Sequence, residues 1–236
     1  MSKIPFYLGN LAACFVPGSD RRAHCRAYVN LFFYYPTITR FIRRAFGEKT
    51  HSVKFIRQRT LNRVVCLVND KYYVKIFRDV TPSRIRDFAF LANYVADRLD
   101  VTVPRVIPND RASMYATPRV AGNHILDMDR TAVLAHDQQI QTQMFDIIDQ
   151  LQSIDIAQIP HPERFVTAMQ ERTVEDPITP PQPVLAHFDL NEENIFLDDD
   201  FNICAVIDWD GLSIANNPDT DKRIFLKYWN RYKNRK

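Results

Sequence analysis

The sequence predicts an α+β protein in which a small antiparallel sheet is followed by a mainly helical second part. Two runs rich in β-branched and aromatic residues, 64–68 and 71–77, flank an Asn-Asp pair and indicate a β-hairpin. Apolar residues then recur at helical spacing over 82–99 and 131–154. Three further short apolar runs are typical of buried strands: 184–186, 195–197 and 203–207.

The first 50 residues are expected to form a basic, aromatic helical extension. Two helices, 21–35 and 37–46, are predicted to be separated at Pro36, and the second to end at Gly47. They combine aromatic residues with arginines: Tyr28, Phe32, Phe33, Tyr34, Tyr35, Phe41 and Phe46 with Arg21, Arg22, Arg26, Arg40, Arg43 and Arg44. Two interpretations are open, an interfacial anchor on anionic lipid and an extension packed on the small sheet with its arginines in water.

Charge is distributed unevenly along the 236 residues. Residues 1–63 hold 12 Lys/Arg against 2 Asp/Glu, residues 64–220 hold 12 against 25, and residues 221–236 hold 7 against 1, which gives +10, −13 and +6. The acidic middle is compatible with a metal-dependent site, and the basic ends indicate an anionic partner. No recognised nucleic-acid motif is present, so nucleic acid is not the expected partner. Four scattered cysteines without a C-x-x-C pair indicate reduced thiols in a cytoplasm.

The motif with the most chemical content is H-F-D-L-N-E-E-N over 187–194, followed by I-D-W-D over 207–210. Phosphoryl transfer needs a carboxylate beside the attacking hydroxyl and metal ions held by hard oxygen ligands. Asp189 is the candidate carboxylate, and Asn194 and Asp208 are the candidate metal ligands. A surface loop rich in Asp, Asn and Glu is the alternative, but the apolar runs on either side favour a built site.

These residues resemble the aminoglycoside phosphotransferase and choline kinase group of small-molecule kinases, which has a protein-kinase-like fold. The run 187–194 is similar to the H-x-D-x-x-x-x-N catalytic loop, and 207–210 occupies the place of D-F-G. The resemblance covers residues 53–225 and implies two lobes, with ATP and Mg²⁺ as cofactors and Asp189 as the proton acceptor. More narrowly, the form H-x-D-L-N-x-x-N-I-x-L-D resembles kinases of bacterial lipopolysaccharide sugars.

The run 71–77 carries Lys75 and resembles the V-A-I-K strand, whose Lys contacts the α- and β-phosphates. Alternation places Tyr73, Lys75 and Phe77 on one face, and a Lys among apolar neighbours is costly to bury without a partner. A snorkelling Lys on an edge strand is the alternative. The resemblance implies an acidic partner from the next helix, where Asp87 stands in place of the usual Glu; an ordinary surface charge is equally compatible.

Residues 115–122 resemble the hinge that binds the adenine edge through backbone groups. Because Pro118 has no N–H, Ala116 and Thr117 are the candidates for this contact. The expected phosphate loop is atypical, since 56–63 contains three arginines and no Gly. The predicted divisions are a helical extension over 1–50, an N-lobe over 51–119 and a C-lobe over 120–236.

The sequence therefore predicts an ATP- and Mg²⁺-dependent phosphotransferase acting on a hydroxyl of a small molecule or glycan, with a sugar of surface-polysaccharide or lipopolysaccharide biosynthesis as the favoured acceptor. The expected site residues are Lys75 and Asp189 for catalysis, Lys75, Asp87, Ala116, Thr117 and Asn194 for the nucleotide, and Asn194 and Asp208 for the metal. His187 is expected to brace the loop and Trp209 to pack.

The expected location is the cytoplasm, with peripheral contact to the inner face of the cytoplasmic membrane through residues 1–50 as one option. The alternative function is an inactive pseudokinase that binds a membrane or a protein partner. The missing glycines and Asp87 favour this alternative, and the complete Asp189, Asn194 and Asp208 set disfavours it. A protein kinase is not expected, because no A-P-E-like segment or long activation loop follows Asp208.

Overall fold

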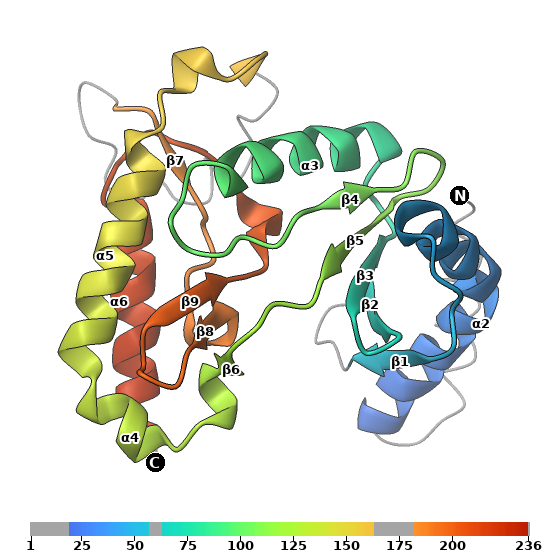
Figure 1. Ribbon diagram of the computed structural model, residues 1–236, viewed down its shortest axis with the longest axis horizontal. Helices are drawn as coiled ribbons and strands as arrows, with labels where there is room; N and C mark the ends of the chain where they lie inside the picture. The colour runs from blue at the N-terminus through green and yellow to red at the C-terminus, as the bar shows by residue number, and fades with distance from the viewer. Residues whose placement is uncertain (1–18, 57–62, 163–181, 236) are drawn as a thin grey trace. The chain divides into compact units, whose positions relative to one another are not determined.

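The computed structural model describes residues 19–56, 63–162 and 182–235, which form two compact units (Figure 1). Unit 1 comprises Met1–Ala89 and Val106–Arg119, and unit 2 comprises Phe90–Arg105 and Val120–Lys236. Helix α3 (Pro82–Ala96) contributes to both units, because the division falls within it.

Unit 1 is built on a five-stranded antiparallel sheet in the order β1-β2-β3-β5-β4. Its strands are β1 (Val53–Ile56), β2 (Arg63–Val68), β3 (Tyr72–Phe77), β4 (Ile107–Pro108) and β5 (Met114–Pro118). The predicted hairpin is confirmed: Asn69 and Asp70 have φ of 55° and 56°, and Lys71 N–H donates to Val68 O at 3.0 Å. Asn and Asp tolerate positive φ better than other side chains, so this pair reverses the chain without a glycine.

Helix α2 (Ser19–Phe46) covers one face of this sheet. The shared core consists of Tyr34, Ile38, Phe41 and Ile42 from α2 with Val64, Cys66, Val68, Val74, Ile76, Ala112, Met114 and Ala116. The four helix residues recur at i, i+4, i+7 and i+8, which defines a single inward face. The helix therefore packs on the small sheet, as one of the two interpretations of the extension predicted.

The predicted separation of this helix at Pro36 is wrong, because α2 continues through that residue. A proline inside a helix removes one backbone donor, and the carbonyl four residues earlier loses its partner. Pro36 is exposed, and Phe32, which carries that carbonyl, is 78% exposed. Water can solvate the carbonyl there, while Tyr34 and Ile38 hold the helix on the sheet before and after the proline.

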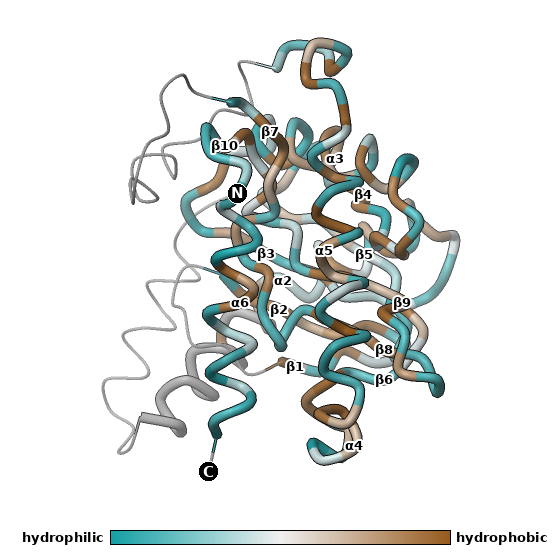
Figure 2. The backbone as a smooth tube through the Cα atoms, turned by 90° about the vertical axis from the view of Figure 1, so that its left-hand side faces the viewer, coloured by the Kyte–Doolittle hydropathy of each residue, from teal (hydrophilic) through white to brown (hydrophobic). Residues whose placement is uncertain are grey.

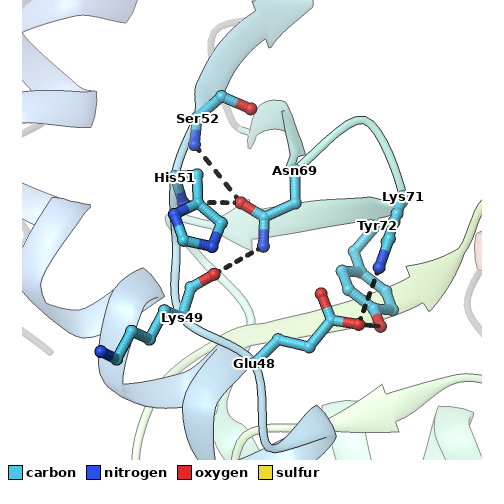
Figure 3. A network of polar contacts seen from close by, with 7 residues as sticks. All are labelled: Glu48, Lys49, His51, Ser52, Asn69, Lys71 and Tyr72. Carbon is cyan, nitrogen blue, oxygen red and sulfur yellow. Dashed lines mark hydrogen bonds and ion pairs between the residues drawn. The ribbon is translucent and has the colours of Figure 1, made fainter.

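The side chain of Asn69 connects the β2–β3 turn to the segment after α2 (Figure 3). Its Oδ1 accepts from His51 N at 2.8 Å and from Ser52 N at 3.3 Å, and its Nδ2 donates to Lys49 O at 2.8 Å. These three contacts satisfy backbone groups that no strand or helix pairs within the described residues. One side chain in the turn therefore orders the connection between helix and sheet.

A second group of contacts holds the C-terminal end of α2 to β3 (Figure 3). Glu48 Oε1 accepts from Lys71 Nζ at 3.0 Å and from Tyr72 OH at 2.9 Å. The hydrogen bond from Lys71, followed by that from Tyr72, lowers the pKa of the Glu48 carboxyl. The Tyr72 ring also stacks on Phe46, with centroids 3.8 Å apart. The helix end is thus bound by both polar and aromatic contacts.

Unit 2 contains three helices after α3 in its described residues, with two small antiparallel sheets. The helices are α4 (Arg130–Ala135), α5 (Asp137–Ser153) and α6 (Thr220–Lys233). One sheet has the order β6-β8-β9, from β6 (Asn123–His124), β8 (Ile195–Leu197) and β9 (Ile203–Val206), and the other pairs β7 (Val184–Ala186) with β10 (Ser213–Ala215). The three predicted apolar runs therefore form β7, β8 and β9.

Helices α5 and α6 lie side by side (Figure 1), and hydrophobic and hydrophilic residues alternate along both (Figure 2). The inward face of α5 is formed by Ile140, Met144, Ile147, Ile148 and Leu151, all buried. Burying one such side chain contributes about 1.5–3 kcal/mol before the entropy cost of folding. This face explains why α5 supports the unit although its outward residues are polar.

The predicted single helix over 131–154 is wrong in one respect, because it breaks at His136 into α4 and α5. The His136 ring stacks on Phe201, with centroids 4.0 Å apart. The neighbouring Asp137 begins α5, and its Oδ1 accepts from Trp229 Nε1 at 2.6 Å. Two adjacent side chains thus contact different elements. These contacts stabilise the break more than the hydrogen bonds of one continuous helical turn would stabilise a single helix.

The remaining predicted helices form with small changes in their ends. Helix α3 ends at Ala96 rather than at residue 99, and Thr81 caps it through Oγ1, which accepts from Arg84 N at 3.3 Å. The last helix of the chain's described part is α6, which begins at Thr220. The expected phosphate loop, 56–63, lies mostly outside the described residues. None of the helices in the described ranges is long and apolar enough to cross a bilayer.

We expect Asn69→Ala to lower the free energy of unfolding by about 1–3 kcal/mol, because it removes three hydrogen bonds and places Ala at positive φ. Asn69→Asp keeps the acceptor for His51 and Ser52 and loses only the donor to Lys49, so its effect is expected to be smaller. Chemical denaturation of the three proteins measures this difference. An Ala variant as stable as the parent would show that the turn does not hold the helix connection.

Candidate active site

Strand pairing in unit 2 brings the two halves of the motif together. Strand β8 follows Asn194 directly, and β9 leads into Ile207 and Asp208. The pair Ile195↔Val206 fixes the antiparallel register, and Ile207 N–H donates to Asn194 O at 2.9 Å. The predicted metal ligands Asn194 and Asp208 therefore lie near each other at the ends of one pair of strands, and their metal-binding role stays a prediction.

The side chain of Asp189 is held by two amides of its own loop. Asn191 Nδ2 donates to Asp189 Oδ1 at 2.8 Å, and Asn194 Nδ2 donates to Asp189 Oδ2 at 3.2 Å and to its backbone O at 2.8 Å. Asn191 also caps the short helix η5 (Glu192–Asn194), because its Oδ1 accepts from Glu193 N at 2.8 Å. Both carboxylate oxygens are thus oriented, which a group that receives a proton at a fixed point requires.

His187 braces the loop, as expected, and is fully buried. Its Nδ1 accepts the N–H of Asp189 at 3.2 Å, so the proton resides on Nε2, which lies 3.0 Å from Ile207 O and donates to it. The neutral ring therefore links the two halves of the motif. Trp209 packs against the His187 ring at 4.4 Å between centroids and donates from Nε1 to Val206 O at 2.8 Å, as its expected packing role implies.

Asp221, at the start of α6, is the most buried acidic side chain of this region and was not assigned a role from sequence. Its two carboxylate oxygens accept from His187 N at 2.6 Å and from Phe188 N at 2.9 Å. Phe188 has φ of 65°, a strained state for an aromatic residue. Burial raises the pKa of the Asp221 carboxyl from 3.8 to about 6, although the two backbone hydrogen bonds act to lower it.

The backbone after β9 is shaped by two further constraints. Asp208 has φ of 58°, in the left-handed region, and begins the short helix η6 (Trp209–Gly211). A Cβ added to Gly211 would lie 2.8 Å from His187 O, closer than real Cβ contacts. Position 211 therefore requires glycine, because the turn at Trp209–Gly211 runs directly against the backbone of His187.

An ion pair between a buried acid and an exposed arginine ties the same loop to the segment after α6. Glu192 is 2% exposed, and its Oε1 accepts from Arg235 Nη2. Its other oxygen, Oε2, is buried and has no hydrogen-bond partner among the described residues. Removing Arg235 would leave the buried Glu192 carboxylate without its charged donor. Sequence reasoning missed this pair because an acid in a polar loop carries no signal of burial.

Unit 1 holds four of the five predicted nucleotide residues, and the fifth, Asn194, lies in unit 2. Lys75 lies on β3, which is flanked by β2 and β5, so the edge-strand alternative for this lysine is wrong. Its Nζ lies 5.7 Å from the centroid of the Tyr115 ring, its cross-strand neighbour. Ala116 has strand partners on both sides, in β3 and β4, whereas Thr117 lies beyond the end of the two-residue strand β4. Asp87 is half-buried on α3, and the nucleotide roles of all four residues stay predictions.

The donor set fits a Mg²⁺ ion that keeps several waters. Among residues 19–56, 63–162 and 182–235, no group of three His, Cys, Asp or Glu side chains could hold a metal. Mg²⁺ is commonly bound through one or two protein oxygens together with water and substrate phosphate. Asn194 directs its Nδ2 to Asp189, which leaves Oδ1 as the amide atom that can bind a cation beside Asp208.

Neither a protein-family model nor a curated protein sequence matches the chain. Solved structures match it in fold. The aminoglycoside phosphotransferase APH(3'')-Id from Streptomyces rimosus has a TM-score of 0.62 at 16% identity, over 85% of this chain and 85% of that chain. The streptomycin–ATP ternary complex of APH(2'')-IIa has a TM-score of 0.60 at 15% identity, over 84% and 81%. The macrolide 2'-phosphotransferase type I has a TM-score of 0.53 at 14% identity, over 86% and 83%.

These matches confirm the predicted α+β, kinase-like fold, in the form found in the aminoglycoside phosphotransferases. They cover most of this chain and most of each matched structure. The sequence identities to these structures are only 14–16%.

We expect the titration of Asp221 to be a main cause of the change in the free energy of unfolding between about pH 4 and pH 6. Because folding raises its pKa from 3.8 to about 6, the folded chain binds this proton more tightly than the unfolded chain. The contribution is therefore complete below about pH 4 and is lost as the pH rises through about 6. Its size is on the order of 3 kcal/mol.

Asp221→Asn is expected to remove this component, so that the free energy of unfolding falls less, or rises more, from pH 4 to pH 6.5 than in the parent. The control is Asp219→Asn, which changes an exposed acid two residues away and should retain the parental slope. Denaturant unfolding at both pH values measures the slopes. Equal slopes in all three proteins would contradict the assignment to Asp221.

Proposed function

We propose that this protein is an ATP- and Mg²⁺-dependent phosphotransferase that transfers the γ-phosphate to a hydroxyl of a small molecule or glycan. The observation that carries the proposal is the direct contact of Asp189 with Asn194, beside Ile207 and Asp208 at the ends of paired strands. A carboxylate for a hydroxyl proton and two oxygen donors for a cation thus lie in one short segment. The kinase-like fold, shared with an enzyme solved with ATP, supports the same reaction class.

In the proposed reaction, the acceptor oxygen forms a bond to the γ-phosphorus, the bond from that phosphorus to the β–γ bridging oxygen breaks, and ADP leaves. The hydroxyl proton goes to the Asp189 carboxylate, which Asn191 and Asn194 hold in place. Mg²⁺, when bound at Asn194 and Asp208, supplies neutralisation of the phosphate charge. Positioning and fixed electrostatics account for most of the rate enhancement in such transfers.

For the nucleotide, we assign Lys75 to the α- and β-phosphates and the backbone of Ala116 and Thr117 to the adenine edge. The support for Lys75 is its place on the inner strand β3, between β2 and β5, with its Nζ 5.7 Å from the centroid of the Tyr115 ring. Of the two hinge residues, Thr117 is the better candidate, since its backbone extends past the end of β4. Asp87 is assigned as the partner of Lys75, with a shorter side chain than the Glu of the resemblance.

For the acceptor, we propose a sugar hydroxyl of surface-polysaccharide or lipopolysaccharide biosynthesis in the cytoplasm, where ATP is available. The support is the narrower sequence resemblance, which includes Ile195, Leu197 and Asp198. Ile195 and Leu197 are buried, and Asp198 accepts from Asn202 N at 2.8 Å to close the β8–β9 turn. These residues shape the loop, so the choice of acceptor rests on the resemblance and calls for a screen that includes amino alcohols and aminoglycosides.

A second candidate is an inactive pseudokinase that serves as a binding protein. The specific observations in its favour are Asp87 in place of Glu and a phosphate loop without glycine. Calorimetric titration of the full chain with ATP, with and without Mg²⁺, distinguishes the two functions. Binding that requires Mg²⁺ supports the phosphotransferase, and no binding at millimolar ATP supports the pseudokinase.

We expect Asp189→Asn to lower turnover by roughly 10²–10⁴-fold, the scale of a lost general base, with ATP binding retained. The matched control is Asp200→Asn, an exposed acid in the β8–β9 turn that should keep parental turnover. Transfer of the γ-phosphate to the best acceptor of the screen measures the effect. A variant with near-parental turnover would exclude Asp189 as the proton acceptor.

We expect Asp208→Asn to weaken ATP binding in Mg²⁺ by roughly tenfold to a hundredfold, the scale of a lost charged contact of about 1.5–3 kcal/mol. Asn is chosen because it tolerates the left-handed backbone of this position better than Ala. ATP binding in EDTA should be unchanged, and Asp200→Asn again serves as the control. Parental affinity for MgATP in the variant would count against Asp208 as a metal ligand.

A further inference from the structure

Helix α2 has an inward face that is committed to the core of unit 1. Tyr34, Ile38, Phe41 and Ile42 are 0–5% exposed and pack against β2, β3 and β5. The contacts of Asn69 and Glu48 hold the segment after the helix to the β2–β3 turn (Figure 3). Because the helix cannot rotate without exposing this core, its opposite face is fixed outward.

The outward face begins with a cluster of exposed aromatic side chains. Phe32 is 78% exposed, and Phe33 and Tyr35 are each 45% exposed. Two adjacent phenylalanines in contact with water are unfavourable, because each large apolar side chain gains about 1.5–3 kcal/mol on burial. Single exposed apolar residues are ordinary, whereas a contiguous group marks a surface that binds something apolar.

The same face continues with arginines. Phe32, Pro36, Arg40 and Arg43 follow one another at helical spacing, and Arg44 lies one turn from Arg40. All three arginines are exposed, and none forms an ion pair within the part of the chain that the structure describes. The sequence 32–47 contains no Asp or Glu. The outward face therefore combines apolar and positive groups without any negative one.

We propose that this outward face, defined by Phe32, Phe33, Arg40, Arg43 and Arg44, binds the surface of an anionic lipid bilayer. A membrane interface offers both of the required partners, an apolar layer for aromatic rings and negatively charged headgroups for arginines. From residue 32 to residue 44 the helix rises about 18 Å, enough to contact several headgroups while lying in the interface plane. The binding is peripheral, and it does not depend on the proposed phosphotransfer.

A protein partner or nucleic acid fits the observations less well. A nucleic acid would use the arginines and a stacked aromatic, but adjacent phenylalanines with a proline on the same face do not provide a regular stacking platform. A protein partner would need an apolar pocket beside an acidic patch, whereas a fluid bilayer adapts to any arrangement of the two. The spatial order of the face, aromatic at one end and basic along the rest, suits partial insertion of that end.

The test is sedimentation of the full chain with phosphatidylcholine vesicles that contain or lack phosphatidylserine. We expect binding to the anionic vesicles and little to the neutral ones, with weaker binding as ionic strength rises. The triple variant Arg40→Gln, Arg43→Gln, Arg44→Gln should lose roughly a hundredfold in affinity, at about fivefold per arginine. The double variant Phe32→Ser, Phe33→Ser should also lose most of the binding.

Matched controls distinguish the effect of this face from the effect of removing any exposed charge or any exposed aromatic residue. Arg111→Gln, Lys227→Gln, Arg231→Gln removes three exposed charges elsewhere, and Phe90→Ser removes an aromatic residue that is 44% exposed on α3. Both controls should bind anionic vesicles like the parent, and thermal melts confirm that all variants remain folded.

Three results would overturn the proposal. Parental protein that binds neutral and anionic vesicles equally, or neither, excludes an anionic membrane as the partner. Unchanged binding in both outward-face variants places the membrane contact elsewhere on the chain. Self-association that the Phe32→Ser, Phe33→Ser variant abolishes, without vesicle binding by the parent, identifies the face as an interface between copies.

Discussion

The buried carboxylate of Asp221 is the interaction on which the candidate active site depends. It lies on α6, yet it accepts the backbone N–H groups of His187 and Phe188 where the chain leaves β7. Without this acceptor, two buried N–H groups would be unpaired at a cost of about 1–3 kcal/mol each, and Phe188 would lose its support at positive φ. The position of Asp189 is thus determined by a helix that begins more than thirty residues later.

Contacts to the backbone organise much of the rest of the site, in addition to the amides of Asn191 and Asn194 that hold the Asp189 carboxylate. The His187 ring links the N–H of Asp189 to the carbonyl of Ile207, and strand pairing sets Asn194 beside Asp208. A fixed backbone reduces the reorganisation needed when charge moves, which is the main way that phosphoryl transfer is accelerated.

Sequence alone predicts those features whose cause is local. The β2–β3 hairpin follows from alternation and an Asn-Asp turn, and the three short strands follow from their apolar runs. Features caused by distant contacts were missed. The core on α2 overrides Pro36, the contacts of His136 and Asp137 break a periodic helix, and the burial of Asp221 and Glu192 arises only when α6 meets the loop. Acidic residues are common at the start of helices, so the position of Asp221 in the sequence did not indicate that its carboxylate is buried.

Gly211 and Asp221 both act on the main chain at His187. Neither touches a reacting atom in the proposed chemistry, but one leaves room for the carbonyl of His187 and the other receives its N–H. Mutation can replace most surface and core side chains with others of similar volume, whereas no side chain at all fits position 211. Substitutions at these two positions therefore act on the site through the main chain of residues 187 and 188, even when every side chain used in the proposed chemistry is retained.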